Sequence, residues 1–130
     1  DWLMYDFSGS LYSALNVSAI TDLLADYNGV PALFAEYIIP PDCTEFPTVN
    51  FYQSGIVDGR QNYGSSTFTI ACRSLEQKEA ETVGDIIFDS INRRNVEDYY
   101  ISCVKLPCIP PADTTDVFNQ PVQVTILRKV

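Results

Sequence analysis

The feature that most constrains the fold is a strand pattern that runs directly into a helix pattern between residues 67 and 95. Phe68, Ile70 and Cys72 alternate with Thr67, Thr69, Ala71 and Arg73, which predicts a strand of an antiparallel sheet with one buried face. After this strand, apolar residues recur three and four positions apart, which predicts an amphipathic helix that ends near Asn95. The apolar stripe of this helix consists of Leu75, Ala80, Val83, Gly84, Ile87, Phe88 and Ile91.

Other segments carry weaker patterns of the same two kinds. Ser74, followed three residues later by Gln77, predicts a capping box at the start of the long helix. A shorter helix is expected from Ser8–Ser10 to Asp26, either kinked or followed by a short helix that ends at Asn28-Gly29. Extended segments are expected over residues 30–40, 46–53, 99–106 and 117–128, with Pro121 at an edge or a bulge.

This order of elements predicts an α+β fold. We expect a mostly antiparallel open sheet of roughly four to five strands, with one long and one shorter helix packed on one face. The 130 residues fit a single domain, residues 1–130. Residues 54–66 are rich in Gly, Asn, Asp and Ser, which predicts a long hairpin loop. The edges of such a sheet invite pairing, and neighbouring subunits can cover them.

The net charge and hydropathy of the chain restrict the classes of partner that it can bind. A net charge of −9, from 17 acidic and 8 basic residues, argues against tight nucleic-acid binding, which requires a basic face. An acidic wall repels a phosphate backbone and lets it slide, so passive contact with DNA stays open. The sequence has no apolar run of about 18 residues, so we expect no membrane partner. Because the chain lacks a basic leader and an initiator Met, we expect that its true start was processed or lies upstream.

The residue inventory argues against an enzyme. Histidine is absent, which removes the commonest general base near neutral pH and the commonest metal ligand. The glycines Gly55, Gly59 and Gly64 lack the lysine of a P-loop, and we interpret them as turn residues. The sequence therefore predicts no catalytic residue, no cofactor and no metal. Four cysteines, Cys43, Cys72, Cys103 and Cys108, permit two disulfides or a zinc site, but without a secretion signal we expect free thiols.

Two further groups of residues leave alternatives open. The acidic residues from Glu76 to Asp89 follow the polar side of the long helix, so a solvated face is favoured over a calcium or glycosidase site. Tyr52 lies just before the predicted hairpin loop and Tyr63 lies within it. They can pack at the margin of the core with a wet hydroxyl, or they can anchor a contact between subunits.

The whole pattern resembles the tail terminator, or tail completion, proteins of long-tailed bacteriophages. The resemblance spans nearly the whole chain and rests on the pattern of elements, without a catalytic motif. Its segments are Leu11-Tyr12-Ser13-Ala14-Leu15 with Ile20-Thr21-Asp22-Leu23-Leu24, then Phe46-Pro47-Thr48-Val49-Asn50-Phe51, then the strand from Thr67 to Ser74 with the helix from Glu76 to Ile87, and finally Val122-Gln123-Val124-Thr125-Ile126. The loop from Pro107 to Asp116 is longer than is typical of that family.

The resemblance implies a structural virion protein. Such a protein forms a homo-hexameric ring that caps the tail tube, stops its polymerisation and offers a joining surface to the head completion or connector protein. DNA passes through the lumen without specific binding, and the ring sits in the tail-neck region of a virion assembled in the host bacterial cytoplasm. The partners implied are the chain itself, the tail tube protein and the head connector.

The predicted assembly interface lies on and beside the hairpin loop. Its candidate residues are Tyr52, Asp58, Arg60, Gln61, Asn62 and Tyr63. A ring requires one patch that meets a different patch on the neighbouring copy. Alternative functions are a head-completion stopper, a tail tube subunit and, from a different class, a small acidic ligand-binding or regulatory domain.

Overall fold

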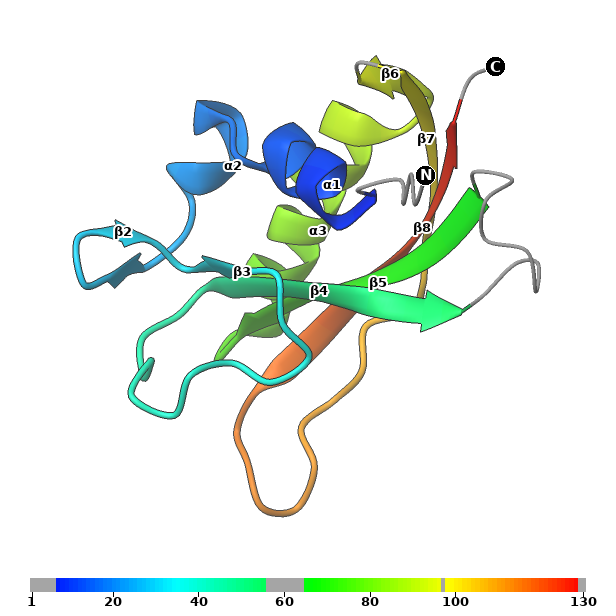
Figure 1. Ribbon diagram of the computed structural model, residues 1–130. Helices are drawn as coiled ribbons and strands as arrows, with labels where there is room; N and C mark the ends of the chain where they lie inside the picture. The colour runs from blue at the N-terminus through cyan, green and yellow to red at the C-terminus, as the bar shows by residue number, and fades with distance from the viewer. Residues whose placement is uncertain (1–6, 56–64, 97, 129–130) are drawn as a thin grey trace.

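The chain folds into one curled sheet with helices on a single face. The computed structural model describes residues 7–55, 65–96 and 98–128. The elements are α1 (Phe7–Leu15), α2 (Ser18–Thr21), β1 (Asp26–Tyr27), β2 (Val30–Pro31), β3 (Leu33–Phe34), β4 (Thr48–Gly55), β5 (Ser65–Ser74), α3 (Gln77–Ile91), β6 (Arg94–Val96), β7 (Tyr99–Lys105) and β8 (Phe118–Arg128). Figure 1 shows the three helices on one side of the sheet, and the connections 35–47 and 106–117 on the other.

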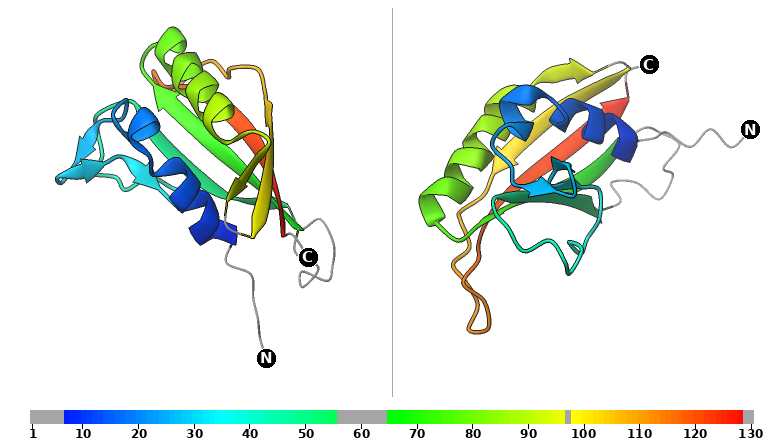
Figure 2. Two further views of the ribbon diagram at one scale, coloured as in Figure 1. Left: turned by 90° about the horizontal axis from the view of Figure 1, so that it is seen from above. Right: turned by 90° about the vertical axis from the view of Figure 1, so that its left-hand side faces the viewer.

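The predicted α+β class is confirmed, but the sheet is larger than expected. It contains six strands in the order β3-β4-β5-β8-β7-β6, and β1 pairs with β2 in a separate hairpin. The additional strand is the short edge strand β6, whose three residues are too few to show a clear alternation. From the extended segment expected over residues 30–40, only Leu33–Phe34 joins this sheet, as β3. The pairing of β3 with β4 is parallel, so the sheet is mixed, while β4, β5, β8, β7 and β6 pair antiparallel. The views in Figure 2 show how far this sheet curls beneath the helices.

The core lies between the helices and the sheet, and it matches the predicted alternation. Phe68, Ile70 and Cys72 of β5 are buried, as are Val122, Val124 and Ile126 of β8. From α3, the buried side chains are Ala80, Val83, Ile87 and Ile91, whereas Leu75, which the predicted stripe included, is exposed. Leu75 stands outside the helix because α3 begins only at Gln77.

The predicted capping box at Ser74 is wrong. Glu76 is the N-cap residue, and no side-chain hydrogen bond caps the first turn. Ser74 instead ends strand β5, where its hydroxyl accepts a hydrogen bond from the Glu76 amide at 3.2 Å and donates one to the Glu79 carboxylate. The hydrogen bonds of Ser74 therefore stabilise the turn between β5 and α3 and do not cap the helix.

The prediction that Pro121 sits at an edge or a bulge is also wrong, because Pro121 lies in β8 between β5 and β7, and its pairing with β5 shows no register shift. The proline is tolerated where β7 ends. Its carbonyl accepts a hydrogen bond from the Leu106 amide at 3.1 Å, and its ring nitrogen can donate nothing in return. The buried Gln120 side chain supplies the missing donor, since its amide nitrogen donates to the Leu106 carbonyl.

The N-terminal region follows the second of the two predicted alternatives, a helix and then a short helix. The short helix ends at Thr21, earlier than Asn28-Gly29. Asn28 and Gly29, with φ of 53° and 88°, instead form the turn between β1 and β2. Two successive positive φ values are typical of the tight turns that Asn-Gly favours in hairpins.

Candidate assembly surface

The predicted assembly interface falls partly on described residues. Tyr52 lies on β4, next to the hairpin that β4 forms with β5, whereas Asp58, Arg60, Gln61, Asn62 and Tyr63 lie outside the described residues. The ladder between the two strands runs from Thr48↔Arg73 to Gly55↔Thr67, with an irregularity between Gln53 and Gly55. The surface can therefore be built around Tyr52 and the root of the hairpin.

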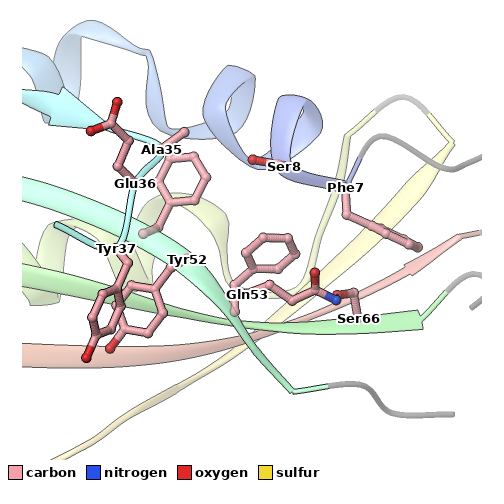
Figure 3. A pocket seen from close by; sticks show the side chains of 10 residues that line it. Phe7, Ser8, Ala35, Glu36, Tyr37, Tyr52, Gln53 and Ser66 are labelled. Atoms are coloured by element: carbon pink, nitrogen blue, oxygen red, sulfur yellow. The ribbon is translucent and has the colours of Figure 1, made fainter. Parts of the chain in front are cut away.

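Tyr52 forms an aromatic pair with a residue that the sequence analysis did not single out. Its ring packs edge-to-face against Tyr37, with centroids 4.7 Å apart and planes at 83°. Figure 3 shows the two rings side by side, Tyr37 from the connection before β4 and Tyr52 from the strand itself. Tyr37 and the neighbouring Ile38 are 68% and 70% exposed, so they present an apolar surface to the solvent.

A buried asparagine holds this connection against the sheet. The Asn50 side-chain amide donates to the carbonyls of Glu36 at 3.0 Å and Tyr37 at 3.2 Å. Its oxygen accepts a hydrogen bond from Arg73 Nε at 3.1 Å, and the residue is fully buried. A buried amide with each of these partners fixes one local geometry, because a lost partner would leave a polar group unsatisfied. Asn50 thus positions Tyr37 and Ile38 at the margin of the sheet.

A groove of about 320 Å³ opens beside the Tyr37–Tyr52 pair. Its walls combine aromatic rings with polar groups, as Figure 3 shows, and Gln53 Nε2 donates to Ser66 Oγ at 3.0 Å in its wall. The lining residues are Phe7, Ser8, Ala35, Glu36, Tyr37, Phe51, Tyr52, Gln53, Ser66 and Phe68. The groove lies at the β4 side of the sheet, beyond the two residues with which β3 pairs. We call Tyr37, Ile38, Tyr52 and this groove the β4 margin.

A second group of exposed apolar residues lies at the other edge of the sheet, near the end of β7. Val104, Leu106 and Ile109 are 57%, 36% and 50% exposed, at the end of β7 and in the connection that follows. Val104 is the register partner of Gln123, and Ile109 forms an isolated bridge with Asn119, so both project from the helix-free face. We call these three residues the β7 margin. The alternation of Val104 and Leu106 in the sequence was a signal that could have located it.

The face between the two margins is almost without charge. One cross-strand row runs from Tyr52 through Thr69 and Gln123 to Val104. Among the described residues of β4, β5, β8 and β7 that point to this face, the only charged side chain is Arg73. By contrast, acidic residues such as Asp85 and Asp89 are exposed on α3, where Asp85 pairs with Lys105.

The pKa values of the cysteines favour their protonated, unreactive thiol form. All four cysteines are free thiols. Burial raises the pKa of Cys72 and of Cys103 to about 12, and burial also raises the pKa of Cys43 and of Cys108. A raised pKa lowers the fraction of thiolate, the form that attacks electrophiles and binds metals. In the described part of the chain, no three metal-ligating side chains come together, and no helix has the length and apolarity of a membrane span.

The fold has a counterpart among solved structures. A chain of the structure described as "Virion of native gene transfer agent (GTA) particle" superposes with a TM-score of 0.69 at 11% sequence identity, and the match covers 100% of each chain. No protein-family model and no curated protein matches the sequence. At 11% identity the structural likeness shows that the two chains share one fold over their whole length.

Proposed function

We propose that this chain is a structural virion protein, and more specifically the tail terminator of a phage-like particle. In this role it forms a homo-hexameric ring that caps the tail tube, stops its polymerisation and joins the tail to the head connector. The observation that carries the proposal is the fold shared over the full length with a chain of a gene transfer agent virion. The ring would act in the tail-neck region of a particle assembled in the host bacterial cytoplasm.

The exposed surface supports an assembly role. Five exposed apolar side chains or aromatic rings gather at two margins of one sheet face, instead of being scattered as single residues. The face between them carries little charge, and the central part of protein interfaces is depleted in charged residues. The residues that the sequence offers for chemistry are, in contrast, thiols with raised pKa values and carboxylates along an exposed helix face.

The charge supports a lumen through which DNA slides. A ring of six chains, each with a net charge of −9, would carry an excess of negative charge. Proteins that hold DNA place Lys and Arg against phosphates and release counterions, and the affinity then falls steeply with salt. An acidic ring would repel the phosphates and leave the duplex free to move.

Electron microscopy and mass measurement of the purified protein test the proposal. A tail terminator stays monomeric or stops at one closed ring, because its second face has no partner of its own kind. A tail tube subunit continues to add rings and forms long tubes, so long tubes would contradict the proposed role. A single chain that retains a metabolite through purification would instead support the ligand-binding alternative.

A head-completion stopper is separated from a terminator by its binding partner. A terminator binds the end of a tail tube before it meets the head, whereas a stopper binds to the filled head first. Pull-down with purified tubes and with purified heads of the same particle therefore distinguishes the two roles. The proposal requires binding to tubes in the absence of heads.

A further inference from the structure

The Tyr37–Tyr52 pair of the β4 margin and the β7 margin lie at opposite ends of one cross-strand row on the helix-free face, whereas the groove opens beside that pair at the β4 edge, toward α1. The row Tyr52–Thr69–Gln123–Val104 crosses four strands. Three strand spacings separate its ends, so the margins lie about 14 Å apart. Each margin also borders an open edge: β3 pairs only with residues 49 and 50 of β4, and β6 pairs only with residues 99–101 of β7. In the described structure, the rest of these two edges has no strand partner.

We propose that the β4 margin of one copy docks onto the β7 margin of the next copy, in a heterologous contact that repeats around the ring. The inference deepens the proposed ring and rests on it, since it names the surfaces that would build it. Heterologous contacts generate closed rings when the rotation between copies closes. The occupant of the β4 margin is thus the apolar surface of a second copy of this chain.

The shapes of the two margins favour this pairing. The β4 margin is hollow, with a groove of about 320 Å³ walled by Tyr37, Tyr52 and other residues. The β7 margin is raised, because Ile109 stands on the connection 106–117, which projects from the sheet in Figure 1. Half-exposed aliphatic side chains that pack against the exposed Tyr37 and Ile38 side chains would bury apolar surface on both copies.

The strand directions also favour this pairing. Because β4, β5, β8 and β7 alternate in direction, β4 and β7 run antiparallel to each other. A rotation about an axis roughly along the strands preserves the direction of each strand. The β7 edge of one copy would then meet the β4 edge of the next copy as an antiparallel neighbour, and the up-and-down order would continue from copy to copy.

Repulsion between like charges disfavours contacts between copies through the acidic surfaces of the chain. Each copy carries a net charge of −9, so contacts through acidic surfaces such as the exposed side of α3 would be repulsive. Charges at a contact must also be desolvated, which costs free energy unless they are well paired. The two margins and the face between them carry few charges: among the described residues these are Arg73, which donates to the buried Asn50, and Glu36 in the wall of the groove.

Blocking one margin at a time tests the contact. Ile38→Asp places a carboxylate on the β4 margin, and Ile109→Asp places one on the β7 margin. Val17→Asp, at a 41% exposed site between α1 and α2, adds the same charge on the helix side and is the matched control. Sedimentation velocity at protein concentrations up to about 1 mM measures self-association, so that even a weak contact is detected. Circular dichroism checks that each variant is folded.

The expected result has two parts. Each margin variant alone loses self-association by at least about tenfold, because the contact would have to desolvate a carboxylate, whereas the Val17→Asp protein assembles as the wild type does. An equimolar mixture of the two margin variants forms heterodimers and nothing larger, because one intact β7 margin meets one intact β4 margin. Val104→Asp, a second variant of the β7 margin, should behave as Ile109→Asp does.

Four outcomes would overturn the inference. The wild type could stay monomeric at the highest concentration, or a mixture of the two margin variants could form no heterodimer. A margin variant could also assemble normally or still dimerise with itself. These failures are distinct from a failure of the proposed function. A terminator that assembles only on its tube would be monomeric and would refute the inference alone. Long tubes of wild-type protein that both margin variants abolish would refute the terminator role and leave the contact intact.

Discussion

At the scale of single residues, one close approach fixes how α3 sits on the sheet. Gly84 of α3 lies directly over the buried Gln120 of β8, and a Cβ at position 84 would stand 2.5 Å from Gln120 Cγ. Gln120 cannot easily move away, because its amide donates to the carbonyls of Leu106 and Pro121. Position 84 therefore requires glycine, because the space above Gln120 leaves no room for a side chain.

We predict that Gly84→Ala destabilises the protein. Replacing a helical glycine with alanine ordinarily gains up to about 1 kcal/mol, whereas overfilling a tight contact costs about 1 to 3 kcal/mol. Because the clash involves a side chain held by hydrogen bonds, we expect a net loss in the free energy of urea unfolding. In a Gln120→Ala background, which removes the clashing side chain, Gly84→Ala should cost less than it does in the wild type. Independent, additive effects of the two substitutions would contradict the proposed contact.

The buried thiol of Cys72 predicts a loss of stability in alkali. Its pKa rises from 9.0 to about 12 on folding, because burial disfavours the thiolate. The protonated thiol is the favoured form in the fold, so its contribution is fully present below pH 9 and is lost progressively between pH 9 and 12. In this window the free energy of unfolding should fall by on the order of 1 kcal/mol per pH unit through this group.

The Cys72→Ala variant isolates this effect. It should be less stable than the wild type at pH 7, because a buried sulfur is removed, but the difference should shrink as the pH rises above 9. Urea unfolding of both proteins at several pH values measures the difference, and the titration of tyrosines and lysines is common to both. A constant difference across this range would show that Cys72 does not carry the dependence.

At the scale of secondary structure elements, β8 holds the sheet together in spite of its proline. Pro121 has no backbone N–H to donate toward β7. The Gln120 side-chain amide donates to the Leu106 carbonyl in its place. We predict that Gln120→Leu destabilises the protein by about 1 to 3 kcal/mol, because it leaves a carbonyl without its donor. Pro121→Val in the same chain should restore part of the loss, since valine supplies a backbone N–H at that position.

Thermal and urea unfolding of the two variants test this substitution of donors. The double variant should be more stable than Gln120→Leu alone. If Pro121→Val instead lowers the stability of the Gln120→Leu protein further, the side chain does not act in place of the backbone donor. The Gln120→Met variant is a control of similar size that lacks the donor.

The elements with clear periodicity could be predicted from the sequence. The alternation of Phe68, Ile70 and Cys72 located β5, and the apolar stripe from Ala80 to Ile91 located α3. The strand β6 could not be predicted, because its three residues show no period and its pairing depends on β7. The segment 30–40 was expected to be extended, but its sequence does not show that only Leu33–Phe34 joins the sheet, parallel to β4. Pro121 was assigned to an edge or a bulge because proline has no backbone N–H, and its tolerance inside the sheet depends on Gln120, a tertiary contact that no local pattern records.

The candidate surface was predictable only in part. Tyr52 could be named because it stands beside a loop-rich stretch, but its partner Tyr37 lies far from it in sequence and meets it through the hydrogen bonds of Asn50. The β7 margin arises where the end of a strand and a proline-rich connection reach the same face. Such groupings depend on the register of four strands. Asp58, Arg60, Gln61, Asn62 and Tyr63 remain predictions, since they lie outside the described residues.

At the scale of the whole molecule, the net charge of −9 predicts weak interaction with DNA. We expect no retention of a DNA duplex in mobility-shift experiments at physiological salt, and at most a slight effect of salt, because few phosphates would be neutralised. Affinity that falls steeply between about 50 and 200 mM salt would indicate a basic binding face and would contradict the proposed passive lumen.

The central claim is that this chain ends the growth of a tail tube, and the length of tubes measures it most directly. Tube subunits of the same particle are allowed to polymerise with increasing amounts of this chain, and the lengths are counted by electron microscopy. The account predicts arrest at amounts far below that of the tube subunit, with one added ring at a tube end. Unchanged lengths, or incorporation of this chain along the tube wall, would contradict it.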